Sequence, residues 1–300
     1  MAGDVVNADP AGPLTVAAAR RVGRKQLNDA DVAEADQWVD WLLTSVLRLS
    51  RCELAVAATT PLSAIQRERF FAHLGRAVRH EPPQYIVGEA EFMGWPLYCD
   101  ARALIPRPET EQGVAMMVAD TRWQQRAGPV AADIGTGTGA IAIALAQLYP
   151  AASYWAVEMS PDALELATAN VKRHGVTDRI RLLPGHGTHP LADDAVDLIA
   201  ANLPYLTTAE WEALPRHIRE YEPRQALDGG ADGLDVIRVV VADTPRVLRS
   251  GGCCYLEIGA RQGRAVAKLL EQAGFQDIAI RPDWSQRDRY VCGRWPLSRV

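Results

Sequence analysis

The spacing of hydrophobic residues changes along the chain and divides it into two regions. Between residue 31 and about residue 80, apolar residues recur every three or four positions, which predicts amphipathic helices. From residue 129 onward, short apolar runs alternate with segments of helical spacing. We expect strands near 129–133, 153–157, 180–183, 196–201, 253–258, 278–280 and 290–292, and helices over 140–148, 161–173, 236–247 and 263–273. Strands that alternate with helices predict an α/β fold with a doubly wound, mostly parallel sheet.

Turn residues and local composition divide the chain further, into four segments. Residues 1–30 are rich in Ala, Gly, Pro and Asp, and we expect a flexible tail there. Residues 31–82 are expected to form a small helical domain of about three helices. Residues 83–104 are expected to form a hairpin linker, and residues 105–300 the α/β domain.

The composition limits the classes of function. The 300 residues are 48% hydrophobic, with a formal net charge of −5 and a pI of about 5.7, which disfavours a protein that grips long nucleic acid. The five cysteines have neither zinc-ligand spacing nor the even number of a disulfide framework, so we expect no metal site. No apolar run approaches the ~18 residues of a membrane helix, and the N-terminus lacks a signal-peptide core. We therefore expect a cytoplasmic protein.

A glycine-rich turn follows the first strand of the α/β region. Gly135, Gly137 and Gly139 can adopt positive φ angles and let a ligand approach the backbone, and the next helix offers free N–H groups. Asp133 before the turn would repel a pyrophosphate, but it suits the cationic sulfonium and ammonium groups of S-adenosylmethionine. Glu158 ends the next strand, where a carboxylate can accept hydrogen bonds from both ribose hydroxyls. The predicted cofactor-binding residues are Asp133, Gly135, Thr136, Gly137, Thr138, Gly139, Glu158, Gly187 and Asn202.

The tetrapeptide Asn202-Leu203-Pro204-Tyr205 follows a buried strand, whose end opens into the ligand crevice of such a sheet. The Asn202 side-chain oxygen and the Leu203 carbonyl can each accept one N–H of a substrate amide. Tyr205 can lie flat against the planar group, and Pro204 stiffens the loop. An amide nitrogen is a poor nucleophile, and two acceptors orient it and favour charge on it. We therefore predict methyl transfer to a planar amide or aromatic amine, with Asn202, Pro204 and Tyr205 as catalytic residues and Asn202, Leu203, Pro204 and Tyr205 as substrate-binding residues.

Together with further motifs, these features resemble the release-factor glutamine N5-methyltransferase family, also called PrmC or HemK, over about residues 35–295. The further motifs are Pro83-Gln84-Tyr85-Ile86-Val87-Gly88, Phe92, Ile105-Pro106-Arg107-Pro108-Glu109-Thr110-Glu111, Ser160-Pro161, Ala163-Leu164, Asn170, Tyr221-Glu222-Pro223, Ala226-Leu227, Gly229-Gly230, Asp232-Gly233-Leu234 and Arg287-Asp288-Arg289. The proline-rich stretch around Arg107 is the most specific, because amino-methyltransferases that act on DNA generally lack it.

The resemblance implies a class I S-adenosylmethionine-dependent methyltransferase with a Rossmann-like, mostly parallel sheet and a small N-terminal helical domain. The substrate would be the side-chain amide of the glutamine in the Gly-Gly-Gln motif of class I peptide-chain release factors, and the product of the cofactor would be S-adenosylhomocysteine. Residues 202–205 would hold this glutamine, and the helical domain would help to dock the release factor. No direct contact with nucleic acid or with a membrane is implied.

Two positions depart from the family pattern. Position 203 is usually Pro and here is Leu, which keeps the backbone carbonyl but adds an N–H and removes some stiffness. The segment Gly185-His186-Gly187 stands where the family often has an acidic residue followed by a bulky one, near the adenine. His186 is therefore either an adenine contact or an exposed loop residue.

Three other functions stay open. A sister activity, on a glutamine of a ribosomal protein, shares most of these motifs. The sequence Asn-Leu-Pro-Tyr is also typical of ribosomal-RNA adenine dimethylases, so an adenine amino-methyltransferase acting on RNA or DNA is a second alternative. The balanced charge of the N-terminal region argues against it. The third is a scaffold that binds S-adenosylmethionine, with Leu203 marking lost catalysis.

Overall fold

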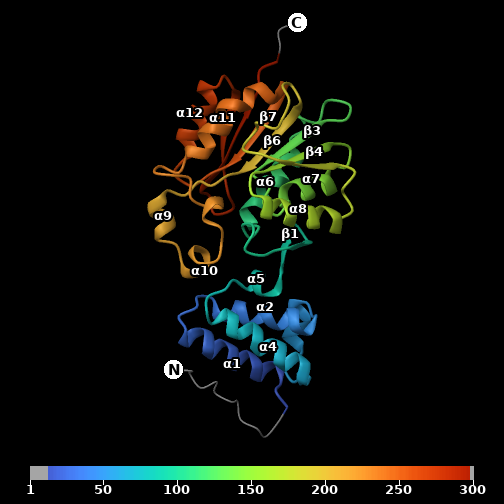
Figure 1. Cartoon of the computed structure of the whole chain (residues 1–300), viewed down its shortest axis with the longest axis vertical. Helices are drawn as coiled ribbons and strands as arrows, with labels where there is room; N and C mark the ends of the chain where they lie inside the picture. The colour runs from blue at the N-terminus through green and yellow to red at the C-terminus, as the bar shows by residue number, and fades with distance from the viewer. Residues whose placement is uncertain (1–12, 298–300) are drawn as a thin grey trace. The chain divides into compact units, whose positions relative to one another are not determined.

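The computed structural model describes residues 13–297, and the chain divides into two compact units, Met1–Val87 and Gly88–Val300 (Figure 1). The described part of the first, the helical unit, contains α1 (Val16–Asp29), α2 (Ala35–Leu47), α3 (Arg51–Val56), α4 (Ala64–Ala77) and α5 (Pro83–Val87). Its core is built from the periodic apolar positions, and Leu42 and Leu43 of α2 pack with Phe70 and Leu74 of α4, all fully buried. The predicted helical spacing is therefore what closes this unit.

The predicted flexible tail is wrong for Val16–Asp29, which form α1. The Thr15 side chain accepts a hydrogen bond from the Ala18 backbone N–H and caps the helix. Val16, Ala19 and Leu27 lie in the core of the helical unit. The Ala-rich composition that suggested disorder is also that of a strong helix former. The prediction for residues 1–12 lies outside the described residues.

The segment 83–104 is not one linker, because it belongs to both units. Pro83–Val87 form α5 of the helical unit. The predicted hairpin is present as the antiparallel pair β1 (Glu89–Phe92) and β2 (Trp95–Tyr98). Asn170 fixes this hairpin within the second unit, because its side chain accepts from the Tyr98 N–H at 2.7 Å and donates to the Tyr98 carbonyl at 3.0 Å.

The second, α/β unit is built on a seven-stranded sheet in the order β5-β4-β3-β6-β7-β9-β8. The strands are β3 (Val130–Ile134), β4 (Ser153–Glu158), β5 (Ile180–Pro184), β6 (Val196–Asn202), β7 (Leu248–Glu257), β8 (Gln276–Pro282) and β9 (Asp288–Arg294). Pairing is parallel from β5 to β7 and antiparallel on both sides of β9. The mostly parallel, doubly wound sheet predicted from the sequence is confirmed.

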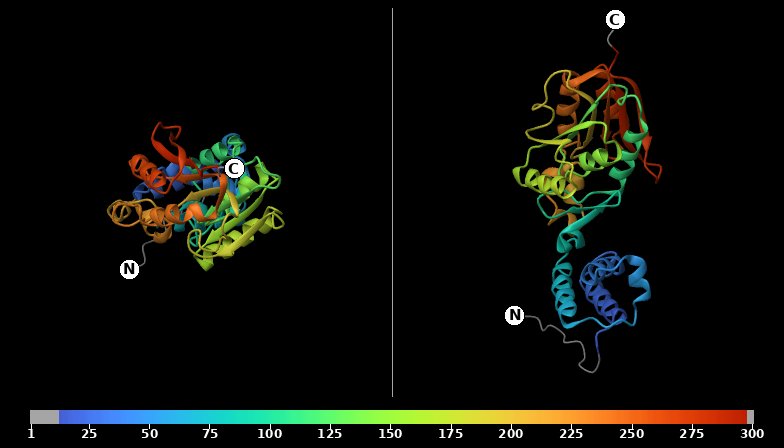
Figure 2. Two further views of the ribbon diagram at one scale, coloured as in Figure 1. Left: turned by 90° about the horizontal axis from the view of Figure 1, so that it is seen from above. Right: turned by 90° about the vertical axis from the view of Figure 1, so that its right-hand side faces the viewer.

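Helices cover both faces of this sheet (Figures 1 and 2). They are α6 (Pro108–Ala119), α7 (Ala140–Leu148) and α8 (Pro161–Arg173) on one face, and α11 (Asp235–Val247) and α12 (Gly263–Gln272) on the other. Within β6, Leu198 and Ala200 pack in the first layer, and Ile199 and Ala201 in the second. Burial on both faces explains why this strand reads as a continuous apolar run rather than an alternating one.

The strand order creates a switch point beside β3. The chain runs from β3 through β4 to the edge strand β5, and then crosses to β6 on the other side of β3. Ligand crevices in such sheets lie at this reversal, outside the carboxyl ends of the strands. Three short helices beyond β6 were not predicted, because three to five residues give no periodic signal. They are α9 (Thr208–Glu212), α10 (Arg216–Arg219) and the 3₁₀ turn η1 (Arg224–Ala226).

Candidate active site

A pocket with a cavity volume of about 150 Å³ opens at the carboxyl ends of β3, β4 and β6. Nine of the predicted site residues line it, namely Gly135, Thr136, Gly137, Thr138, Glu158, Gly187, Asn202, Leu203 and Pro204. Three others, Asp133, Gly139 and Tyr205, are not among the lining residues. The structure therefore brings most of the predicted cofactor and substrate residues to one cavity, and gives these three a different place.

Asp133 lies beneath the glycine turn and organises it. Its Oδ2 accepts hydrogen bonds from the Thr136 hydroxyl at 2.5 Å and from the Ala142 N–H at 3.1 Å, where α7 begins. Its Oδ1 is buried and has no hydrogen-bond partner among the described residues. Burial raises the pKa of Asp133 to about 7, against the lowering effect of the bond from Thr136. Asp133 thus supports the loop rather than lining the cavity.

The three glycines of the turn have two different tasks. Gly135 and Gly137 line the pocket with φ angles of +72° and +55°, which only glycine adopts freely. Gly139 instead faces the helix layer, where a Cβ atom would lie 3.2 Å from Ile143 Cδ1 and 3.6 Å from Ala167 Cβ. The first two allow close approach of a ligand, and the third allows α7 to pack against α8.

Glu158 ends β4 and is buried at the side of the glycine turn. Its two carboxylate oxygens accept hydrogen bonds from the Gly137 N–H and the Ser160 N–H, both at 2.9 Å. A carboxylate has about four acceptor positions, so two remain for a ligand. This donor and acceptor set fits a ribose diol, and the glycine backbone leaves the space that a nucleoside needs.

The far end of the pocket is formed by the Gly185–Gly187 segment after β5 and by Met159 after β4. Met159 is 58% exposed, whereas His186 is half-buried and its ring lies 6.0 Å from that of His189. Gly187 has a φ of +56°, and a Cβ atom there would lie 3.3 Å from Val240 Cγ2. A bulky residue at position 187 is therefore excluded by both backbone conformation and packing.

Asn202 lies at the last position of β6, and buried polar groups behind it hold its amide. Asn202 Nδ2 donates to Thr110 Oγ1 at 3.0 Å, and the Thr110 hydroxyl donates to Glu257 Oε2 at 2.7 Å. Asn202 Oδ1 is then left as the acceptor of the side chain. Thr110 belongs to the proline-rich motif and Glu257 ends β7, so residues far apart in sequence meet at this point.

Tyr205 is held beside the pocket by Arg289. The Arg289 guanidinium donates to the Tyr205 hydroxyl at 3.2 Å and lies 5.8 Å from the ring centroid. Burial raises the pKa of the Tyr205 phenol to about 12, so the hydroxyl stays protonated at neutral pH.

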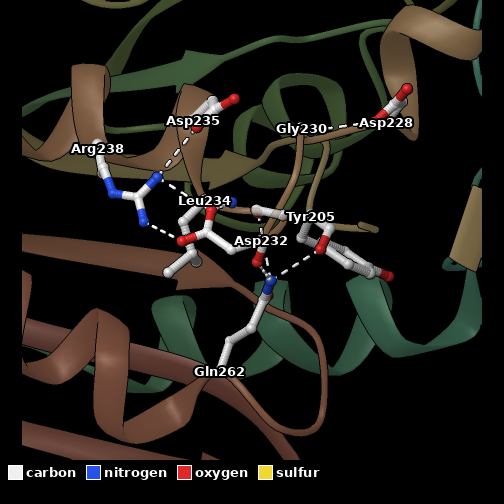
Figure 3. A network of polar contacts seen from close by, with 9 residues as sticks. Tyr205, Asp228, Gly230, Asp232, Leu234, Asp235, Arg238 and Gln262 are labelled. Atoms are coloured by element: carbon white, nitrogen blue, oxygen red, sulfur yellow. Dashed lines mark hydrogen bonds and ion pairs between the residues drawn. The ribbon is translucent and has the colours of Figure 1, made fainter. Parts of the chain in front are cut away.

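Gln262 clamps the backbone around the tetrapeptide, as Figure 3 shows. Its Nε2 donates to the carbonyls of Tyr205 at 2.8 Å and Gly233 at 3.2 Å, while its Oε1 accepts from the Gly259 N–H at 2.8 Å. Sequence analysis missed Gln262, because nothing in its spacing distinguishes it from a surface residue at the start of a helix.

Two glycine motifs of the sequence allow this clamped loop to form. A Cβ atom on Gly229 would lie 2.6 Å from the Pro204 carbonyl oxygen, and one on Gly233 would collide with the Tyr205 carbonyl. Leu206 is paired here as well, because its N–H donates to the Leu227 carbonyl and its carbonyl accepts from the Gly229 N–H. The Gly229–Gly233 segment therefore lies directly against the backbone of the tetrapeptide.

The proline-rich motif and the Tyr-Glu-Pro motif meet through Glu222. This buried carboxylate accepts from the Ile105 N–H at 3.1 Å and from the Arg107 guanidinium at 2.5 Å. Ile105 and Arg107 of the proline-rich motif line the pocket, and so does Pro223 of the Tyr-Glu-Pro motif. An ion pair between the partly exposed Arg107 and the buried Glu222 thus joins two walls of the cavity.

Within residues 13–297 there is no group of three or more His, Cys, Asp or Glu side chains that could hold a metal ion. Across the same described residues, no helix is long and apolar enough to cross a membrane.

Comparison with known proteins places this chain in a family. The models of the PrmC N-terminal domain and of a methyltransferase domain match residues 18–88 and 131–221. The release factor glutamine methyltransferase of Geobacter sulfurreducens is 39% identical, over 90% of this chain and 93% of its own. That of Gloeobacter violaceus is 38% identical, over 89% and 91%. A methyltransferase structure from Pyrococcus furiosus, 16% identical, shares the fold with a TM-score of 0.52 over 68% of this chain and 91% of that one. The fold class and the family resemblance predicted from the sequence are thereby confirmed, and the chain belongs to the release factor glutamine methyltransferase family.

Proposed function

We propose that the chain methylates the side-chain amide nitrogen of the glutamine in the Gly-Gly-Gln motif of class I peptide-chain release factors. The observation that carries this proposal is the hydrogen bonding of the Asn202 side-chain amide. Its Nδ2 is tied to Thr110 on the protein side, so Oδ1 is the acceptor available to a primary amide in the pocket. The Leu203 carbonyl supplies the second acceptor of the same short segment.

The cofactor is proposed to lie along the glycine turn. Gly135 and Gly137 give the close approach, and Glu158 has acceptor positions free for the ribose hydroxyls. S-adenosylmethionine supplies a methyl group already activated by the sulfonium, and it leaves as S-adenosylhomocysteine. We place the adenine at the Gly185–Gly187 end, and we propose that no metal takes part.

The residues of the tetrapeptide then act by orientation rather than as a strong base. Asn202 and the Leu203 carbonyl accept the two N–H groups and fix the direction of the nitrogen, which is worth several powers of ten in rate when the reacting atoms are aligned. Pro204 holds the turn, since its φ is fixed. Tyr205, neutral and held by Arg289, is proposed to flank the planar amide.

The test is methyl transfer with labelled S-adenosylmethionine to three separate substrates: a recombinant class I release factor, bulk ribosomal protein, and bulk RNA with DNA. We expect a mass gain of one methyl on the peptide that bears Gly-Gly-Gln, and none when its glutamine is replaced. Label in a ribosomal protein or in nucleic acid, with none in the release factor, would contradict the proposal. It would then favour the sister activity or the adenine amino-methyltransferase.

We also propose that the helical unit docks the release factor. Val56 and Ile65 are apolar side chains of this unit that are 85% and 64% exposed. With Val56→Glu and Ile65→Glu combined, we expect a higher KM for the whole release factor and an unchanged KM for a short Gly-Gly-Gln peptide. The matched control is Ala265→Glu, which adds a charge at an exposed position of α12. Equal KM values for the whole release factor in the wild type, the double variant and the control would contradict this docking role.

A further inference from the structure

A buried chain of three polar side chains lies behind the amide of Asn202. It runs from Asn202 Nδ2 to Thr110 Oγ1 at 3.0 Å, and from the Thr110 hydroxyl to Glu257 Oε2 at 2.7 Å. Thr110 is 7% and Glu257 5% exposed. A cavity of about 10 Å³, lined also by Tyr290, borders all three. Glu257 has no role in the function proposed above, and Thr110 enters it only as the partner of the Asn202 amide.

The charge of Glu257 decides the direction of every hydrogen bond in this chain. An ionised carboxylate only accepts, so the single hydroxyl hydrogen of Thr110 must point to it. Thr110 Oγ1 can then only accept from the other side, and the one donor of Asn202 is its NH₂ group. The two ends of a side-chain amide have nearly the same shape, and only such a network distinguishes them.

We propose that Thr110 and Glu257 are positioning residues, which keep Oδ1 of Asn202 facing the substrate as long as Glu257 is ionised and release this constraint when Glu257 is protonated. The inference rests on the proposed role of Asn202 as the acceptor for the glutamine amide. A protonated Glu257 donates to Thr110 Oγ1, and the Thr110 hydroxyl hydrogen turns to Asn202. The amide is then satisfied with Oδ1 toward Thr110, and its NH₂ group faces the NH₂ group of the substrate.

The surroundings of Glu257 place this change within reach of neutral pH. Burial raises the pKa of Glu257 to about 7, and the bond from Thr110 and the nearby Arg289 partly oppose that shift. The other titratable groups that face it are Glu109 on α6, Tyr205 after β6 and Tyr290 on β9. Glu109 raises the pKa of Glu257 further, and burial raises the pKa values of both tyrosines, so neither competes for the proton near pH 7.

The sign of the effect follows from the raised pKa. Well above pH 7 Glu257 is ionised, so the productive orientation of Asn202 is fully populated there. As the pH falls through about 7, the ionised fraction declines, and we expect kcat/KM to fall about tenfold per pH unit. Titration of Asp133 beneath the glycine turn would change the affinity for S-adenosylmethionine. Calorimetry of cofactor binding at each pH therefore separates that titration from the effect of Glu257.

The experiment compares Glu257→Gln, Thr110→Val and Thr110→Ser with the wild type in pH profiles of kcat/KM for the release factor. In Glu257→Gln we expect the decline below pH 7 to disappear, since a glutamine amide does not titrate. In Thr110→Val we expect a loss of about 10–100-fold at pH 8, because the Asn202 NH₂ group loses its buried partner. Thr110→Ser keeps the hydroxyl, and it is expected to recover activity and the acidic limb relative to Thr110→Val.

Two controls keep the outcomes distinct. Thermal unfolding and S-adenosylmethionine affinity show whether each variant is folded and binds the cofactor. If Asn202→Ala is active, the proposed role of Asn202 fails and this inference fails with it. If Asn202→Ala is inactive, while Glu257→Gln keeps the wild-type acidic limb or Thr110→Val keeps the wild-type kcat/KM, the inference alone is overturned.

Discussion

The two ends of the pocket are built in different ways. At the Asn202 end, buried side chains from α6 and β7 hold the reacting segment, and the half-buried Gln262 before α12 holds its backbone. At the Gly185–Gly187 end, the walls are an exposed methionine, a half-buried histidine and glycine backbone. One end is fixed by a hydrogen-bond network, whereas the other is shaped mainly by the absence of side chains.

This difference matches two different physical demands. A transferred methyl group requires its acceptor nitrogen to be aligned within a fraction of an ångström, and a misplacement of 1 Å can cost about 10²-fold in rate. A planar base can instead be bound by contact area and a few polar groups, which tolerate small shifts. Substitutions at the Asn202 end should therefore affect turnover, and those at the other end should affect binding weakly.

The largest effect is expected for Asn202→Ala. Removal of the side-chain acceptor should lower kcat by about 10²–10³-fold, as loss of one oriented polar group does in other active sites. The dissociation constant for S-adenosylmethionine should change little, since Gly135, Gly137 and Glu158 remain. Stopped assays with labelled cofactor and calorimetry measure the two quantities, with Gln272→Ala, an exposed position on α12, as the control. Full activity of Asn202→Ala would remove the catalytic assignment.

Loosening the backbone clamp should come next. Gln262→Ala removes the donor to the carbonyls of Tyr205 and Gly233, so the tetrapeptide loop should lose its fixed position. We expect kcat/KM for the release factor to fall about 10–100-fold, with cofactor affinity preserved. Gln262→Glu is the sharper variant, because it keeps the size but places an acceptor against carbonyl oxygens, and it should be at least as damaging. Wild-type kinetics in both variants would show that the clamp is not needed for alignment.

The sequence predicted the parts of the site that are continuous in the chain. The glycine turn, Glu158 and the tetrapeptide could be located because each follows a strand, and parallel strands end at one edge. Gln262 and the Thr110–Glu257 pair could not, since their function depends on contacts across 29 to 147 residues of sequence. Asp133 was predicted to bind the cofactor, but it lies buried beneath the turn and does not line the pocket, a placement set by tertiary packing rather than by its position before the glycines.

The same limit applies to the fold. Periodicity identified the long helices and the buried strands, whereas α1 was mistaken for a tail because Ala and Asp occur both in helices and in disordered segments. The helix is stabilised over a disordered segment by Val16, Ala19 and Leu27, which pack against the other helices of the helical unit. A composition count cannot detect that contact.

Glu158 lies between the two ends, and it should give an intermediate effect confined to binding. Replacement by Gln leaves the shape but removes the charge that accepts hydrogen bonds. Bonds to charged groups contribute about 1.5–3 kcal/mol, so the dissociation constant for S-adenosylmethionine should rise about 10–100-fold. At saturating cofactor, kcat should stay within a few-fold of the wild type. A large fall in kcat at saturation would mean that Glu158 also positions the reacting groups.

His186 should give the smallest effect and the most direct test of the comparison. It lies in the Gly185–Gly187 segment, where the family pattern led us to expect an acidic residue, and it is half-buried in a segment whose shape comes from glycine backbone. If that end is formed by backbone, His186→Ala should change S-adenosylmethionine affinity by about twofold or less, as surface substitutions typically do. His186→Asp, which introduces an acidic residue into this segment, should then also stay near wild-type affinity. A change of about tenfold in either variant would show that His186 is a specific contact, and that the Gly185–Gly187 end is recognised as selectively as the Asn202 end.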